Sequence, residues 1–418
     1  MPADYRKRRI RLAQLSKTQK TLLNIVAAAL FDAELDCSSD IDWPDLQREA
    51  TTQTVLPIVY EKIKTSIPEP YKKTWLNASM GIVANNIHIE LQHIQVHRIM
   101  REHQIPYVSM KGVASSQYYP EPILRTMGDV DFLVKSDAFG KTYSLIESQG
   151  FTAEQANDEK TTVAEFTGQT GSRATVWELH REINGIPEGD TGDQIRNFLA
   201  DMIETAVDHI TEEGTCNIPD DFHHGLILLI HTAEHLTSEG IGLRHLCDWA
   251  VFAASLSDQD FVTTFQQPLE GIGLWRFARL LTLCSVRYLG CPARTWAGEA
   301  DEVLLEAIIT DIMTGGNFGT KDDDRYRQIK YIANRGEHTV DSKSPLRQVI
   351  HTMNGKVKAE CGFAARHPAL LPAGWVVTGG KYLGLILTGR RKADSVKTLE
   401  SGKKRKQIYQ QFHLFETE

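Results

Sequence analysis

The spacing of the hydrophobic residues changes twice along this chain, and these changes constrain its fold more than any other feature. Apolar residues keep a helical spacing from about residue 17 to residue 103, for example between Leu22 and Leu30. Short apolar or alternating runs, which are typical of strands, occupy residues 105 to 183. Helical spacing then returns from residue 193 to about residue 312. One block of strands between helical blocks predicts an α+β fold, with a small mixed-sheet core embedded in mostly helical N- and C-terminal segments.

The strand block and the total length suggest how the chain is divided. The predicted strands are Ile105–Met110, Asp129–Val134 and Ala174–Ile183, and the predicted helices between them are Gly112–Tyr119 and Asp137–Ser148. A chain of 418 residues exceeds what a single core usually reaches, which is about 250 to 300 residues. We expect a helical region at 1–103, the sheet core at 104–185, a helical domain at 186–313, and a linker with a C-terminal extension at 314–418.

Charge and cysteine content argue against several classes of protein. A formal net charge of −8 opposes attraction of the whole chain to nucleic acid or anionic lipid, although a basic tract spans residues 390 to 406. The six cysteines form no CxxC pair, which argues against a zinc ribbon and against a disulfide framework. No stretch reaches the roughly 18 uninterrupted apolar residues that a membrane helix needs. We therefore expect a cytoplasmic protein without a membrane span.

Two aspartates alternate with apolar residues in the second predicted strand. Asp129 and Asp131 flank Val130, so both carboxylates point to one face, roughly 6 to 7 Å apart at the backbone. Like charges held this close repel, and one carboxylate would take up a proton unless a hard cation such as magnesium neutralised both. The pair therefore indicates a divalent-cation site. The alternative is two exposed carboxylates that protect an edge strand from aggregation.

Upstream of the aspartates, Lys111 and Gly112 follow one predicted strand and open a helix. Backbone N–H groups and the helix dipole attract anions such as phosphate at a turn of this kind. A glycine also allows a ligand to approach the backbone closely. The turn by itself is weak evidence, and its position before the aspartate pair strengthens it.

The segment from Val108 to Val134 resembles the uncharacterised nucleotidyltransferase family of the polymerase beta superfamily. It has the order strand, Lys-Gly, helix, Tyr-Pro, Arg, Gly-Asp-x-Asp, strand, and the resemblance extends over most of residues 40 to 290. Downstream, VWELHREI at residues 176–183 is similar to the Leu-His strand of the family. HTAEHLTSEGIGLRHLCD at residues 231–248 is similar to its helical His and Leu-Arg/Trp-x-x-Asp region. The chain departs from the superfamily at Val113, where a second small residue is usual, and serines come only at 115 and 116.

The resemblance implies transfer of an NMP group, expected to be AMP, from an NTP, expected to be ATP, by a two-metal mechanism. It implies that Asp129, Asp131 and Glu178 hold Mg²⁺ or Mn²⁺. The residues expected to contact the nucleotide or its phosphates are Lys111, Gly112, Ser115, Arg125 and Gly128. The acceptor is a small molecule, a sugar or a protein, and the net charge disfavours a long nucleic acid.

Several alternatives stay open from the sequence. Arg125 could form a structural ion pair with Glu121 or an aspartate in place of a phosphate contact. His180 could approach the metals or the acceptor, or it could bond a neighbouring backbone group or carboxylate. HTAEH, with His231, Glu234 and His235, also matches the HxxEH pattern of a zinc metallopeptidase. Finally, a protein can keep this fold without turnover and act as a catalytically silent interaction protein.

Overall fold

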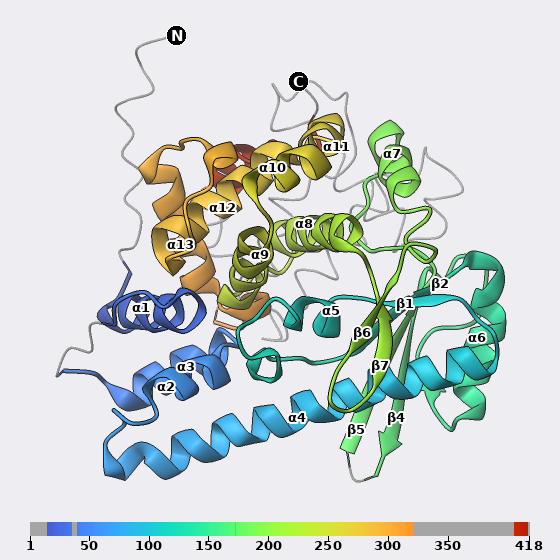
Figure 1. The fold of residues 1–418 in the computed structure, drawn as a ribbon, viewed down its shortest axis with the longest axis horizontal. Helices are drawn as coiled ribbons and strands as arrows, with labels where there is room; N and C mark the ends of the chain where they lie inside the picture. Colours follow the sequence, from blue (N-terminus) through green and yellow to red (C-terminus); the bar gives the residue numbers. More distant parts are fainter. Residues whose placement is uncertain (1–14, 36–39, 172, 322–404, 417–418) are drawn as a thin grey trace, which may run out of the picture.

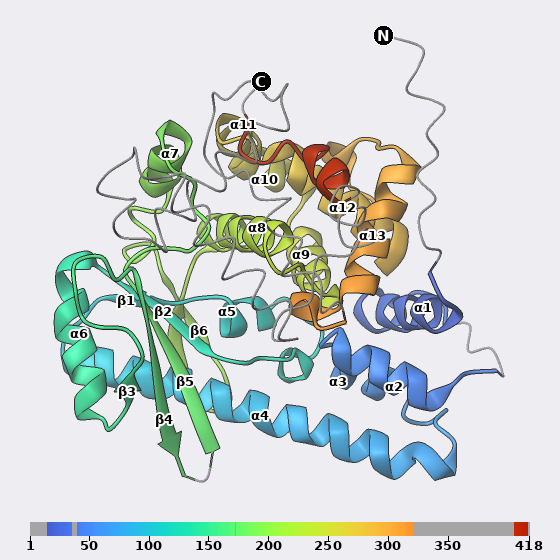
Figure 2. The same cartoon turned by 180° about the vertical axis from the view of Figure 1, so that it is seen from behind.

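The computed structural model describes residues 15–35, 40–171, 173–321 and 405–416. Within these residues a five-stranded sheet lies at one end of the molecule and a group of helices at the other (Figure 1, and from behind in Figure 2). The long helix α4 (Glu69–Glu102) runs alongside both, from α2 and α3 at its start to the sheet at its end. The fold is mixed α+β, which confirms the class predicted from the hydrophobic spacing.

The sheet has the strand order β1-β2-β5-β4-β3. β2 and β5 run parallel and the other neighbouring strands run antiparallel, so the sheet is mixed as predicted. The three predicted strands are present and lie side by side as β1, β2 and β5, and β4 and β3 extend the sheet beyond them. The strands are β1 (Tyr107–Ser109), β2 (Val130–Val134), β3 (Thr152–Ala153), β4 (Val163–Thr170) and β5 (Arg173–His180).

Aromatic side chains fix the central strands against their helices. Phe132 on β2 and Trp177 on β5 are fully buried and meet edge to face, with ring centroids 6.2 Å apart. The helix α6 (Ser136–Ser148) and the second half of α4 contribute to the same core. Truncating a buried aromatic side chain costs about 3 to 5 kcal/mol, so this core holds β2 and β5 in a defined position.

A second hydrophobic core joins the N-terminal helices to the later ones. Leu22 and Val26 of α1 share it with Trp249 of α9 and Phe277 of α12. A capping box starts α1, in which Ser16 and Gln19 exchange side-chain to backbone hydrogen bonds. Between residues 15 and 321 the other α-helices are α1 (Lys17–Phe31), α2 (Trp43–Thr52), α3 (Leu56–Ile63), α5 (Gly112–Ser116), α7 (Asp190–Phe198), α8 (Asp221–Thr237), α9 (Leu243–Ser255), α10 (Asp258–Phe261), α11 (Gln267–Gly271), α12 (Trp275–Leu289) and α13 (Glu302–Gly315).

A β-hairpin interrupts the stretch that was predicted to be helical from residue 193. β6 (Val207–Ile210) pairs antiparallel with β7 (Thr215–Ile218), and β7 lies against β1 and α4. The helical prediction was wrong here. Only Cys216 and Ile218 of the hairpin are buried, and two buried positions are too few to give a recognisable alternation.

Some sequence predictions concern residues outside those described, namely most of the basic tract at 390–406 and most of the extension at 314–418. In the part that is described, the short helix η5 (Asn317–Gly319) follows α13, and Arg405 donates to Asp311 of α13 at 2.8 Å.

No helix among the described residues is long and apolar enough to span a bilayer. The four described cysteines are buried free thiols.

Candidate active site

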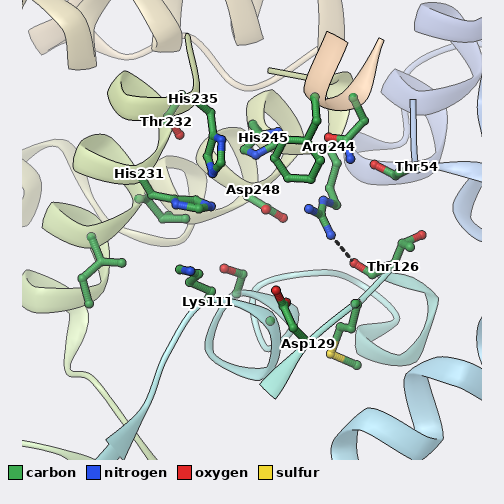
Figure 3. Close-up of a pocket in the computed structure, with 18 of the residues that line it drawn as sticks. Thr54, Lys111, Thr126, Asp129, His231, Thr232, His235, Arg244, His245 and Asp248 are labelled. Atoms are coloured by element: carbon green, nitrogen blue, oxygen red, sulfur yellow. Dashed lines mark hydrogen bonds between the residues drawn. The ribbon is translucent and has the colours of Figure 1, made fainter. Parts of the chain in front are cut away.

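A cavity of about 450 Å³ lies between the sheet and the helices α8 and α9 (Figure 3). Ligand pockets in proteins usually measure about 300 to 1,000 Å³, so the volume of this cavity suits a ligand the size of a nucleotide. Its sheet side is lined by Lys111, Gly112, Ser115, Gly128, Asp129 and Glu178. Its helix side is lined by His231, His235, Arg244, His245 and Asp248.

Asp131 and Glu178 lie directly opposite each other in the parallel pair β2–β5. Paired residues on adjacent strands point to the same face, so their carboxylates lie side by side. Ligand atoms of these two residues and of His180 all lie within 4.8 Å of one another. The structure therefore places Glu178 next to Asp131, although a long stretch of chain separates them.

Two donors neutralise the buried carboxylate of Asp131. Lys111 Nζ donates to Asp131 Oδ1 at 2.5 Å and lies 3.9 Å from Glu178 Oε2. His180 Nε2 lies 3.1 Å from Asp131 Oδ1 and 3.3 Å from Glu178 Oε2. Burial would raise the pKa of Asp131, but the charge of Lys111 and the hydrogen bond from His180 hold it well below its ordinary value. Burial would lower the pKa of His180, yet its bonds to the two carboxylates raise it, so His180 bonds neighbouring carboxylates.

Asp129 lies just before β2 and lines the cavity itself. The negative charge of Asp131, followed by burial and by Glu178, raises the pKa of Asp129 to about 7. This agrees with the expectation from sequence that one of two crowded carboxylates takes up a proton in the absence of a cation. The positive charges of Lys111 and Arg244 act in the opposite direction on Asp129.

The hydrogen bonding and the spacing of the carboxylates suit a divalent cation. Asp131 Oδ2 is buried and has no hydrogen-bond partner among the described residues. Buried carboxylate oxygens are seldom left without a partner, and hard cations prefer such ligands. Of the described residues, Asp131, Glu178 and His180 form the one group of three or more whose geometry could hold a metal. Asp129 is outside that group but close enough to be strongly affected by Asp131.

The turn between β1 and α5 is strained at Lys111, the residue directly before the helix. Lys111 has φ 51° and ψ −104°, a conformation that residues other than glycine rarely adopt. Strain of this kind concentrates at functional sites. Gly112 follows, and a Cβ built on it would point towards Met127 and the backbone of Asp129 at 3.6 to 3.9 Å. Ser115 Oγ is buried without a hydrogen-bond partner among the described residues, and Gly128 is exposed at the cavity edge.

Arg125 forms a structural ion pair, which was the alternative to a phosphate contact. Its Nε and Nη2 donate to the two carboxylate oxygens of Asp248 at 2.8 and 2.7 Å. Tyr119 donates to the same carboxylate at 2.6 Å. Arg125 also lines the cavity, but its donors are largely committed to α9. It therefore connects the loop before β2 to the helical part of the molecule.

The HTAEH histidines do not form a recognisable zinc site. The ring centroids of His231 and His235 lie 4.3 Å apart. The ring of His245 on α9 is about equally distant from the two, at 5.9 Å from His231 and 5.8 Å from His235. Among the described residues, however, this group does not bring three ligand atoms together as the acidic cluster does. The three imidazoles instead line the helix side of the cavity, opposite Lys111 and Asp129 (Figure 3).

Sequence reasoning missed the cavity residues that α9 and η5 supply. Arg244 and His245 stand within the LRHLCD stretch that carried the resemblance, but nothing in the spacing assigned a role to either. Phe318 lines the cavity with φ 51° and contacts the rings of His235 and His245. No pattern in the sequence points to this residue.

A mixed sheet that presents carboxylates on adjacent parallel strands, beside a Lys-Gly turn and under a helical cover, defines a nucleotidyltransferase core. The chain matches the family model described as uncharacterised nucleotidyltransferase over residues 39–290, more than half of its length. It belongs to that family and is a transferase of nucleotidyl groups. No curated protein is significantly similar to the chain.

Proposed function

We propose that this protein moves an NMP group, AMP from ATP, to an acceptor hydroxyl in a reaction that depends on Mg²⁺ or Mn²⁺. The observation that carries the proposal is the pairing of Asp131 with Glu178 on neighbouring parallel strands, at the wall of a cavity that Glu178 and Asp129 line. Carboxylates that lie side by side on neighbouring strands suit divalent cations, which also bind phosphate oxygens. The acceptor is a small molecule, a sugar or a protein.

In this proposal Asp129, Asp131 and Glu178 hold the cations. Bound cations would polarise the α-phosphate, lower the pKa of the acceptor hydroxyl and neutralise the pyrophosphate that leaves. The carboxylates themselves do no covalent chemistry. Asp131 is buried and Asp129 and Glu178 are partly buried, so the strands would keep these charges aligned before the reaction. Such preorganised electrostatics usually supply most of the acceleration.

Lys111 and its turn would contact the phosphates. The ammonium group lies beside Asp131 and at the cavity wall, so a small rotation can direct it to a phosphate oxygen. The hydroxyl of Ser115 is buried at the same wall and has no hydrogen-bond partner among the described residues. Gly112 and Gly128 would lie beside the phosphates at the same cavity, and the space where a Cβ of Gly128 would stand is open. Arg125 would serve as a positioning residue, because it holds the loop that precedes Asp129.

The test uses ATP labelled at either the α or the γ phosphate, with Mg²⁺ or Mn²⁺ and a cell extract as the source of acceptor. Transfer of the α label alone is expected. In Asp131→Asn and Glu178→Gln proteins the transfer should fall by at least about a hundredfold. The matched control is Glu165→Gln, which changes a carboxylate on β4 directly beside Glu178 but outside the cavity lining.

The outcomes separate the possible activities. Transfer of only the γ label would make the protein a kinase. Equal α-label transfer in wild type and Glu178→Gln protein would remove the carboxylate pair from the mechanism. Undisturbed transfer in Glu165→Gln protein would show that any loss at Glu178 is not a general effect of changing the sheet.

A further inference from the structure

Several polar atoms at the cavity have no hydrogen-bond partner among the described residues. Arg244 Nε, Thr126 Oγ1 and His245 Nε2 are buried in this way, and all three residues line the cavity. The nitrogen Nδ1 of His245 accepts from the backbone of Gly242 at 3.3 Å, so Nε2 carries the ring hydrogen. The three atoms are therefore all available as donors. Buried donors without an acceptor are rare in folded proteins, and each one calls for an explanation.

Arg244 is the one of these donors that carries charge. Its Nη1 donates to the backbone carbonyl of Thr126 at 2.8 Å, the bond that Figure 3 draws across the cavity. Among the described residues it forms no ion pair, unlike Arg125, which takes both oxygens of Asp248. The nearest carboxylate on α9 is thus already committed to another arginine.

The surroundings of Arg244 are unfavourable to a cation on its own. Burial, followed by the positive charge of Arg125, lowers the pKa of Arg244 against the opposing effect of Asp248 and Asp129. A guanidinium held in such a place gains most from an anion that enters the cavity. A structural role would be satisfied by a carboxylate partner, and the residues that the structure describes supply none.

The position of Arg244 also restricts the kind of anion. Arg244 and Asp129 line the same cavity (Figure 3), so a ligand at the guanidinium lies on the side that faces Asp129. A ligand there must carry negative charge and also tolerate the acidic residues that line the same cavity, among them Asp129 and Glu178. A polyphosphate complexed with a divalent cation has both properties, and the planar fork of arginine matches phosphate oxygens.

We infer that Arg244, with the hydroxyl of Thr126 and the Nε2–H of His245, forms an anion subsite for the phosphate chain of the nucleotide and for the pyrophosphate product. This subsite deepens the proposed function and rests on it for the identity of the ligand. It lies on the helix side of the cavity, so α9 would close on the phosphates from above the carboxylates. Release of pyrophosphate would require this contact to break.

Isothermal titration with magnesium pyrophosphate tests the subsite directly. Arg244→Ala should weaken binding about ten- to a hundredfold, the usual loss for a charge-assisted contact. Arg244→Lys keeps the charge but not the fork and should lose about threefold to tenfold. Thr126→Val removes only the hydroxyl, leaves the carbonyl that Arg244 uses, and should lose a few-fold. Arg101→Ala, at the exposed end of α4, removes the same charge elsewhere and should bind as wild type does.

Unchanged pyrophosphate binding in folded Arg244→Ala and Arg244→Lys proteins would overturn the subsite. If Arg244→Ala does not fold, as judged by its thermal transition, the Arg244→Lys and Thr126→Val results decide the matter. A wild-type protein that binds no pyrophosphate would also overturn it. A wild-type protein that binds pyrophosphate through Arg244 but transfers no α label would keep the subsite and overturn the proposed function, so the two failures are distinguishable.

Discussion

Lys111 determines the charge balance of the cavity. Its ammonium group bonds Asp131 and lies near Glu178, and the charges of these residues raise the pKa of Lys111 against the effect of burial. Without a cation the lysine is the main compensation for the buried Asp131. A divalent ion would take over that role and leave the ammonium group to a phosphate. Lys111 is therefore expected to serve both stability and turnover.

Lys111→Met should destabilise the protein by about 3 to 5 kcal/mol in EDTA, because it leaves the Asp131 charge buried and poorly compensated. The loss should shrink when Mn²⁺ is added, since the ion replaces the missing positive charge. Urea denaturation with and without Mn²⁺ measures both values. Lys73→Met, at an exposed position of α4, is the control and should change little in either buffer. The same loss at Lys111 in both buffers would contradict this interpretation.

At the scale of the element, the start of α8 depends on an interaction that titrates. Asp220 accepts hydrogen bonds from the backbone N–H of His223 at 2.9 Å and from its Nδ1 at 2.8 Å. Partial burial would raise the pKa of Asp220, but these bonds lower it to about 2. Burial would lower the pKa of His223, and its bond to Asp220 and the charge of that residue raise it instead.

Asp220→Asn keeps a good N-cap and removes the charge, so it isolates the ion pair. The lowered pKa of Asp220 gives stability that is present above about pH 4 and is lost as the pH falls towards 2. The raised pKa of His223 gives stability that is present below about pH 6.5 and is lost as the pH rises through the folded value. Between about pH 4 and pH 6.5 the free energy of unfolding of the variant should therefore be about 1 to 2 kcal/mol below that of the wild type, and outside this range the difference should be smaller. Urea denaturation at several pH values checks this, and a loss independent of pH would refute it.

The elements differed in how well the sequence indicated them. β2 and β5 were predictable because buried Val130, Phe132, Trp177 and Leu179 alternate with polar residues. β3 has only two residues, and the end of β4 is polar around Gly168, so neither shows a clear alternation of apolar and polar residues. Local patterns also carry no information on pairing. That Glu178 faces Asp131 came from the resemblance and depends on the register of two strands that are distant in sequence.

At the scale of the whole molecule, one buried ion pair links the sheet part to the helical cover. Arg125 precedes β2, whereas Asp248 lies on α9, and both side chains are about 5% to 6% exposed. This contact holds α9, and with it Arg244, over the carboxylates. The sequence allowed Arg125 to pair with an aspartate but did not identify which one, because contacts between distant residues follow from tertiary packing.

Asp248→Asn should destabilise the protein by about 3 to 5 kcal/mol, since it leaves Arg125 buried without its counter-ion. The matched comparison is Glu182→Gln, which breaks the exposed ion pair with Arg196 and should cost less than about 1 kcal/mol. Chemical denaturation of both variants gives the two values. Similar small losses in both would mean that the Arg125–Asp248 pair does not hold the two parts together.

The central claim is that the carboxylates on β2 and β5 hold divalent cations against the phosphates of a nucleotide. Anomalous diffraction from crystals grown with Mn²⁺ and a non-hydrolysable ATP analogue measures this most directly. We expect a manganese peak bound by Asp131 and Glu178, with Asp129 nearby and the phosphates extending to Arg244. A peak between His231 and His235, or nucleotide density without manganese at the carboxylates, would contradict it.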